Sequence, residues 1–229
     1  MKKLLPFALA ILLTGCASTE TAKSDAVKQS EIYQDYNIEY DAGSEELSVD
    51  VTFRFGGDKG TTLELSGDSK ILFNGEELRS GTRFFGGAYY YDSFKGELPQ
   101  TLTFEYTNND GEKYVNTNTI VPVFYAEYPG SVKKGESFSV SWSGGALGSD
   151  EDMYGTISDN NGHSYQCNTS ATGATSISFP PNATAEMEAG KAKITLKRKV
   201  KKTPEQTTNI GGRIELSFET EKKQIEILP

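Results

Sequence analysis

The amino-acid sequence predicts an all-β protein built from two tandem β-sandwich domains. Apolar and polar residues alternate with a period of two over many short segments, which is typical of half-buried strands. Turn signals separate these segments at intervals of about 8–12 residues, as they do in sandwiches. The charge also differs strongly between the two halves of the chain, which favours two domains over one.

Residues 1–15 have the pattern of a signal peptide. Lys2 and Lys3 precede an apolar run from Leu4 to Leu13, which is far shorter than the roughly 20 residues of a spanning helix. The run ends in Leu13-Thr14-Gly15-Cys16. This ending resembles the lipobox of bacterial lipoproteins, and the resemblance implies that Cys16 becomes the acylated N-terminus of the mature chain. The alternative is a plain secretory signal followed by a chance cysteine.

The lipoprotein resemblance also implies a location. Stable anchoring needs two or more acyl chains, as in palmitoylated lipoproteins. In enterobacterial members an aspartate directly after the cysteine retains the protein in the inner membrane, whereas this chain has Ala17 and Ser18. For a Gram-negative source we therefore expect a protein of the cell envelope, attached to the outer membrane through Cys16.

Residues 16–32 are expected to form the lipidated N-terminus and a disordered tether. The segment is polar, rich in small residues and without apolar periodicity, a composition that does not support a packed core. Fully extended, about 15 residues would raise the body about 50 Å above the bilayer.

Residues 33–126 are expected to form an acidic β-sandwich. Leu47, Val49, Val51, Phe53 and Phe55 alternate with polar residues, which predicts a strand with one buried face. A second apolar run meets Asn74-Gly75, the strongest short hairpin signal. The segment 102–106 alternates in the same way and is followed by a turn at 108–111.

Residues 127–229 are expected to form a second β-sandwich, after a break at 128–130. Phe138, Val140 and Trp142 alternate with serines. This stretch resembles an early strand of immunoglobulin-like and fibronectin-type-III domains, and the resemblance implies an immunoglobulin-like sandwich. Further strands are expected around 154–158, 163–170, 177–179, 191–200, 213–219 and 224–228.

Charge limits the classes of partner. Residues 34–126 carry 16 acidic and 7 basic side chains, a net charge of −9, and residues 127–229 carry 13 and 12, a net charge of −1. Without Lys2 and Lys3, the mature chain has 21 basic against 32 acidic side chains, or −11. Nucleic acid requires a basic surface and is not an expected partner. With Cys16 acylated, Cys167 is left alone and no disulfide is expected.

A tyrosine-rich stretch is the best candidate for a binding surface. Tyr89, Tyr90 and Tyr91 are consecutive and follow Phe85 and two glycines. Consecutive residues of a strand face opposite sides, so at least one ring is expected to face solvent. Tyrosine is well suited to binding because it is large, amphipathic and loses little entropy. Ordinary sandwich packing or a contact between the domains is the alternative.

A lysine ladder is the second candidate. Lys193, Lys197, Lys199 and Lys201 share one face of an expected strand and would suit an anionic polymer. Lysines also solvate and protect exposed strands. Glu215 and Glu219, on the outward face of the following strand, would neutralise part of the ladder through cross-strand pairs.

The common catalytic and metal-binding motifs do not occur in the sequence. There is no Gly-x-Ser-x-Gly, phosphate loop or His-Glu-x-x-His. His163 and Cys167 would lie about 13 Å apart on one strand, too far to share a zinc ion. The acidic loop 150–152 lacks the spacing of an EF-hand. We therefore expect no catalytic residue, metal or cofactor.

These observations favour a membrane-anchored, non-catalytic module for binding, adhesion or envelope assembly. An envelope protein or a glycan is the expected partner. Two alternatives stay open: a glycan hydrolase that uses a pair of carboxylates, and a structural spacer without a ligand.

Overall fold

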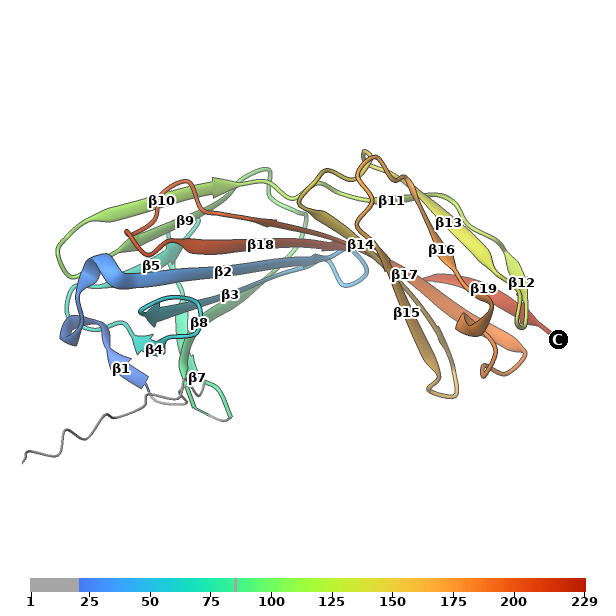
Figure 1. Ribbon diagram of the computed structural model, residues 1–229, viewed down its shortest axis with the longest axis horizontal. Coiled ribbons are helices and arrows are strands. Elements are labelled where there is room, and N and C mark those ends of the chain that lie inside the picture. Colours follow the sequence, from blue (N-terminus) through green and yellow to red (C-terminus); the bar gives the residue numbers. More distant parts are fainter. Residues whose placement is uncertain (1–20, 85) are drawn as a thin grey trace, which may run out of the picture.

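The computed structural model describes residues 21–84 and 86–229. The chain is all-β, with two tandem β-sandwiches arranged along the long axis of the molecule (Figure 1), so the predicted all-β, two-sandwich architecture is confirmed. No helix in the described part of the chain is long and apolar enough to cross a membrane. The signal peptide and Cys16 lie outside the described residues, and the structure does not test those predictions.

The first sandwich packs part of a twelve-stranded sheet against a separate four-stranded sheet. Its strands in the large sheet are β1 (Thr21–Lys23), β2 (Ile32–Asp41), β3 (Glu46–Phe55), β4 (Thr61–Glu64), β7 (Arg79–Thr82) and β8 (Ala88–Lys95). The opposing sheet has the order β10 (Lys113–Asn118), β9 (Leu102–Thr107), β5 (Lys70–Phe73) and β6 (Glu76–Glu77).

The second sandwich uses the rest of the large sheet and a three-stranded sheet. Its strands in the large sheet are β12 (Ser131–Lys133), β14 (Glu151–Asp159), β15 (Ser164–Thr169), β17 (Gly190–Lys202) and β19 (Lys223–Leu228). The opposing sheet has the order β11 (Phe124–Glu127), β13 (Phe138–Ser143) and β16 (Ser176–Phe179), and a short 3₁₀ turn, η3 (Pro181–Ala183), follows β16.

The two cores follow from the alternation in the strands. In the first sandwich, Tyr36 of β2 stacks on Phe104 of β9 with ring centroids 4.5 Å apart. In the second, Phe138 stacks on Phe179 at 4.6 Å. Gly155 of β14 makes room for this pair, because a Cβ there would lie 2.7 Å from the Phe179 ring. Phe138 and Phe179 are register partners within one sheet. The contacts of Tyr36 with Phe104 and of Gly155 with Phe179 cross between sheets, where the apolar faces of the strands are buried.

Several local predictions are confirmed. The alternating segment 47–55 is β3, and 102–106 is β9. Asn74 and Gly75, with φ of 48° and 88°, connect β5 to β6 as a tight hairpin. The later strands expected around 154–158, 163–170, 177–179, 191–200 and 224–228 are β14, β15, β16, β17 and β19.

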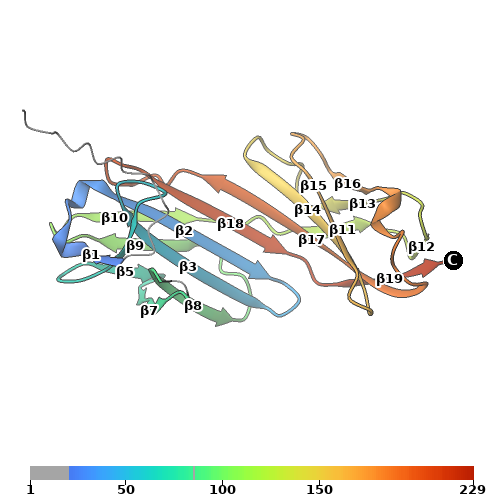
Figure 2. The same ribbon diagram turned by 60° about the horizontal axis from the view of Figure 1, so that its bottom comes forward.

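The expected division at residues 126 and 127 needs one correction. β17 is 13 residues long and pairs with β19 along its first part and with β18 (Gly212–Glu219) along its second. β18 then pairs in parallel with β2 of the first sandwich. A hairpin this long crosses both sandwiches (Figure 2), so residues 212–219 lie in the first sandwich rather than the second.

The expected tether at 16–32 is also corrected for the residues that the structure describes. β1 pairs in parallel with β4, and the 3₁₀ turns η1 (Ser24–Ala26) and η2 (Gln29–Glu31) follow it. Gln29 is buried, and its Nε2 donates to the carbonyl oxygens of Ser24 and Val27 at 2.7 and 2.8 Å. The polar composition was misleading because these polar side chains are buried with their hydrogen bonds made.

Candidate functional site

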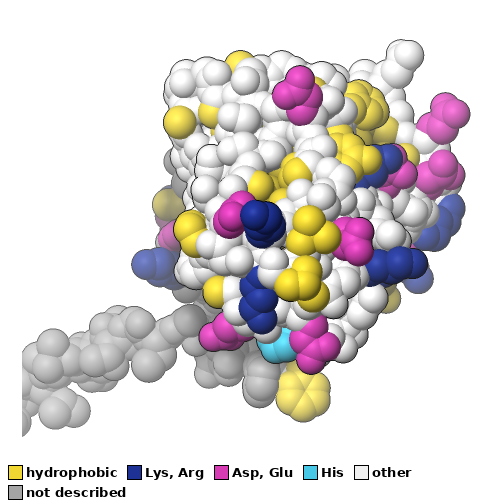
Figure 3. Space-filling model, turned by 90° about the vertical axis from the view of Figure 1, so that its right-hand side faces the viewer, with side chains coloured by type: hydrophobic (Ala, Val, Ile, Leu, Met, Phe, Trp, Pro, Cys, Tyr) yellow, Lys and Arg dark blue, Asp and Glu magenta, His cyan; other side chains and the backbone are white. Residues whose placement is uncertain are grey.

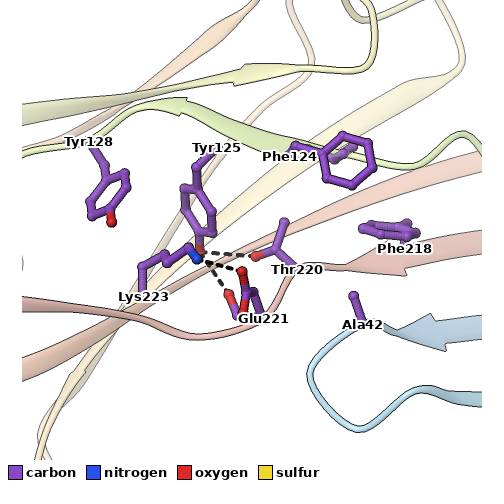
Figure 4. Close-up of a pocket in the computed structure, with 9 residues that line it drawn as sticks. Ala42, Phe124, Tyr125, Tyr128, Phe218, Thr220, Glu221 and Lys223 are labelled. Carbon is purple, nitrogen blue, oxygen red and sulfur yellow. Dashed lines mark hydrogen bonds and ion pairs between the residues drawn. The ribbon is translucent and has the colours of Figure 1, made fainter.

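An aromatic groove of about 470 Å³ lies at the junction of the two sandwiches (Figure 4). Its walls come from the β2–β3 turn, from the segment around β11, and from the end of β18, the start of β19 and the short link between them. The side chains that define it are Phe124, Tyr125, Tyr128, Phe218, Glu221 and Lys223. Its volume falls in the range typical of small-molecule sites.

Buried contacts fix the position of β11 beside the groove. Val123, directly before β11, is 1% exposed and fixes the entry of the strand. The hydroxyl of Tyr125 donates to the carbonyl oxygen of Ile194 at 2.8 Å and accepts from Thr220 Oγ1 at 2.9 Å. Burial raises the pKa of Tyr125 to about 12, so the phenol stays protonated at neutral pH and keeps donating. These bonds connect β11 to β17 and to the β18–β19 link.

The open part of the groove is formed by Phe124 and Tyr128. Phe124 is 60% exposed and meets the edge of the buried Phe218 ring, with centroids 6.4 Å apart. Tyr128 is 40% exposed and lies against Tyr125 at 5.3 Å. Figure 4 shows these two pairs at opposite ends of the groove. Phe124 and Tyr128 therefore supply the exposed aromatic surface of the groove.

The charges at the groove compensate each other. Lys223 Nζ donates to Glu221 Oε1, and this hydrogen bond raises the pKa of Lys223 above its ordinary value. The cation and the carboxylate therefore lie side by side at the groove and offset each other. The groove thus combines aromatic surface with hydrogen-bonding groups and suits a polar ligand without a strong charge.

The tyrosine stretch predicted from the sequence is divided between the two faces of β8. Tyr90 points inward, is 6% exposed, and its hydroxyl accepts a hydrogen bond from the backbone N–H of Leu65. It belongs to the core and is not a surface residue. Tyr89 and Tyr91 lie on the outer face and are half-buried. Phe85 lies outside the described residues.

Tyr89 and Tyr91 are the middle of a four-layer stack. Their rings stack with centroids 5.1 Å apart, and the guanidinium groups of Arg83 and Arg79 cover the outer ring faces at 4.5 and 4.8 Å. Both arginines are also paired, Arg83 with Asp50 at 2.7 Å and Arg79 with Asp92 at 2.9 Å. The ring faces are thus already occupied by cations.

A shallow hollow of about 320 Å³ lies beside this stack. Three carboxylates line it, those of Glu39, Asp50 and Asp92. Burial raises the pKa of Asp50 in spite of the nearby Arg83. Each carboxylate has a cation partner. Asp50 and Asp92 form the arginine pairs described above, and Glu39 pairs with Lys197 at 2.6 Å.

The lysine ladder is partly neutralised. Lys197 pairs with Glu39 at 2.6 Å and lies 3.8 Å from Glu219, and Lys199 pairs with Glu215 at 2.7 Å. Lys193 and Lys201 are exposed. The contacts with Glu219 and Glu215 are the cross-strand pairs that the alternative interpretation of the ladder expects, and Glu39 of β2 is a further partner.

Arg198, which no sequence pattern indicated as a candidate, is buried on the opposite face of the same strand. The guanidinium is 6% exposed, donates to the carbonyl oxygens of Gly144 and Ala146 at 2.9 and 3.1 Å, and pairs with Glu151. Its position two residues after Leu196, on the apolar face of the strand, was the sequence signal that could have indicated its burial. Its contacts fix the loop after β13 and point to a structural role.

The lone histidine belongs to a turn. Asp159 accepts hydrogen bonds from the backbone N–H groups of Asn161 and His163 at 2.9 Å and contacts His163 Nδ1 at 2.9 Å. Burial raises the pKa of Asp159, but these hydrogen bonds outweigh it and lower the pKa to about 2. Within residues 21–84 and 86–229, no three His, Cys, Asp or Glu side chains are grouped to hold a metal.

Comparisons with known proteins give structural likeness only. No family model and no curated protein matches the chain. The fibronectin domains FN1–FN3 of chicken CNTN1 are 10% identical, with 85% of this chain and 66% of that chain covered and a TM-score of 0.25. A Bacteroides ovatus glucan-utilisation protein, SGBP-B, solved with a mixed-linkage heptasaccharide, is 10% identical, with coverages of 81% and 54% and a TM-score of 0.27.

A third solved structure, Yersinia pseudotuberculosis InvD, is 13% identical, with 89% of this chain and 59% of that chain covered and a TM-score of 0.24. The chain thus spans between half and two thirds of these structures. At such TM-scores whole chains do not superimpose, so the ligand of a neighbour is no guide to the ligand of this chain.

Proposed function

We propose that this chain is a lipoprotein of the bacterial cell envelope, anchored through Cys16, and that its body is a non-catalytic binding module. The anchor rests on the lipobox-like sequence alone. The binding role rests on one structural observation, the open aromatic groove at the junction of the sandwiches. Its two most exposed rings, Phe124 and Tyr128, face a hollow whose back is fixed by Tyr125 and Phe218.

A glycan is the ligand class that this groove fits best. The apolar face of a sugar ring packs on an aromatic side chain, while its hydroxyl groups bond to neighbouring polar groups. Glu221 and Lys223 supply such groups along one wall. Because Glu221 and Lys223 neutralise each other, a neutral hydroxyl-rich ligand is favoured over an anionic or cationic one.

The proposal is tested by calorimetric titration of the full chain, purified in detergent, with neutral oligosaccharides and soluble peptidoglycan fragments. We expect Phe124→Ala and Tyr128→Ala each to weaken binding about tenfold, the loss expected of aromatic anchors at a binding site. Ile210→Ala, which removes an apolar side chain outside the groove that is as exposed as Tyr128, is the control. Binding that neither groove variant weakens would refute the assignment of the groove.

A glycan hydrolase is the second candidate, and Asp50 is the observation that favours it. The carboxyl has a raised pKa and shares a hollow with Glu39 and Asp92, and hydrolases of this type use two carboxylates with different environments. Incubation of the wild-type chain with the same oligosaccharides separates the two functions. Product that disappears in Asp50→Asn supports the hydrolase, and intact substrate would refute it.

A further inference from the structure

The chain enters the fold very soon after the proposed anchor. β1 begins at Thr21, five residues after Cys16. Five extended residues span at most about 18 Å. If Cys16 carries the lipid, the corner of the first sandwich that contains β1 lies within about that distance of the bilayer surface.

β1 and the turns that follow it are fixed to the body. Thr21 is in register with Thr62 of β4, and their hydroxyls are 3.3 Å apart. Ser24 is fully buried, and its Oγ accepts from the backbone N–H of Ser66 at 2.9 Å and from Asn109 Nδ2 at 3.1 Å. If this segment detached from the body, these buried polar groups would lose their hydrogen bonds, at a cost in free energy. The segment therefore stays on the body and does not lengthen the link between the body and the membrane.

The hairpin between β7 and β8 ends at the same corner. A Cβ added at Gly87 would lie 3.2 Å from Thr62 Oγ1, and Thr62 is the register partner of Thr21. Figure 1 shows the tip of this hairpin beside β1, at the lower edge of the first sandwich. Phe84 lies three residues before Gly87 in this tip and is 95% exposed.

Hydrogen bonds fix the base of the hairpin and hold the Phe84 side chain in an exposed position. The backbone N–H of Arg83 donates to the carbonyl oxygen of Gly87 at 3.0 Å. The backbone N–H of Gly86 donates to the carbonyl oxygen of Arg83 at 2.9 Å. The Arg83 side chain is bonded to Asp50 and lies over the Tyr89 ring. A large aromatic side chain on such a support is well suited to the interface of a lipid bilayer.

We propose that Phe84 is a second membrane contact, which enters the bilayer surface beside the acylated Cys16. This inference rests on the proposed lipid anchor. Two contacts at one corner would hold that corner of the first sandwich at the bilayer surface.

The test uses the full lipidated chain in vesicles of phosphatidylethanolamine and phosphatidylglycerol, with or without brominated acyl chains. Phe84→Trp places a fluorophore at the proposed contact. The native Trp142 is 4% exposed and lies in the core of the second sandwich, so the wild-type chain gives the background signal. Tyr128→Trp, on the surface of the second sandwich, is the matched control.

We expect brominated lipid to cause about a twofold loss of the emission added by Phe84→Trp, and no loss for Tyr128→Trp, because bromine quenches only at the depth of the acyl chains. Flotation of the same samples reports the anchor separately. Protein that floats without quenching would overturn the Phe84 contact and leave the anchor standing. Equal quenching of both variants would also overturn it, and protein that does not float would refute the lipoprotein assignment itself.

Discussion

Two neighbouring tyrosines of β8 have opposite environments. Tyr90 is 6% exposed and meets Phe53 edge-on at 6.0 Å, whereas Tyr91 lies outside, between Tyr89 and Arg79. We expect Tyr90→Ala to lower the free energy of unfolding by about 3–5 kcal/mol, because it leaves a cavity in the core. Tyr91→Ala should cost less than about 1 kcal/mol. Urea denaturation measures both, and equal losses would contradict the assignment of Tyr90 to the core.

Asp159 gives the hairpin turn before β15 a dependence on pH. Its folded pKa of about 2 lies below the unfolded value of about 3.9. The carboxylate therefore stabilises the fold fully above about pH 4, and this contribution is lost as the pH falls through the folded pKa. We expect Asp159→Ala to lower the melting temperature at pH 7 and to lower it less at pH 2.

Melting curves of wild type and Asp159→Ala between pH 7 and pH 2 check this expectation. Asp58→Ala, in an exposed turn, is the control for a general change of net charge. A difference between wild type and Asp159→Ala that is the same at every pH would show that the turn does not depend on the ionised carboxylate.

At the scale of elements, the outer edge of β10, on the side away from β9, is covered by the loop between β17 and β18. Gln206 Oε1 accepts from the backbone N–H of Val115 at 2.8 Å, and Asn116 exchanges two hydrogen bonds with the backbone of Gln206, both at 2.9 Å. A covered edge is protected from pairing with other chains.

Gln206→Ala removes only the side-chain bond to Val115. We expect the Val115 amide to exchange with solvent about tenfold faster, which corresponds to the loss of one hydrogen bond. Hydrogen exchange followed by NMR measures this rate, and the amide of Tyr106 in the neighbouring β9 is the internal reference. An unchanged Val115 rate would mean that the side chain does not protect the edge.

The elements that the sequence predicts well are those whose alternation is strict. The pattern of β3 and the Asn74-Gly75 hairpin are sufficient for their assignment. β2 was not recognised, because its inward positions include Gln34, which is buried and accepts a hydrogen bond from Tyr36 at 2.8 Å. β1 and its turns were missed for the same reason, since the buried groups Ser24 and Gln29 are polar. A pattern of hydrophobicity does not detect burial that depends on hydrogen bonds.

At the scale of the whole molecule, the groove could not be predicted because it is assembled from distant parts of the chain. Ala42, Phe124 and Phe218 line it together, although each belongs to a different strand or turn. They meet only because β18 crosses into the first sandwich, and no local pattern indicates that parallel pairing with β2. The tyrosine stretch was visible locally, and two of its rings do lie on the surface, but their stacking with arginines depends on the pairing of β7 with β8.

The same crossing predicts that the two sandwiches unfold together. Leu216 of β18 is buried in the first core and Ile225 of β19 in the second, while β17 pairs with both strands. Neither core is complete without this shared hairpin, so we expect one cooperative transition in urea. Trp142 fluorescence reports the second sandwich, and the near-ultraviolet circular dichroism of the buried tyrosines, which include Tyr36 and Tyr106, reports the first.

The two midpoints should coincide in the wild-type chain. Leu216→Pro should separate them, because proline removes a backbone donor from a central strand. The first sandwich would then lose its structure at a lower urea concentration than the second, whose β17–β19 pairing lies at residues 190–194. Two separate midpoints in the wild type would mean that the hairpin joins the sandwiches without coupling their stability. The junction groove would then be free to change shape between its two walls, whereas a single transition means that a ligand meets a preformed site.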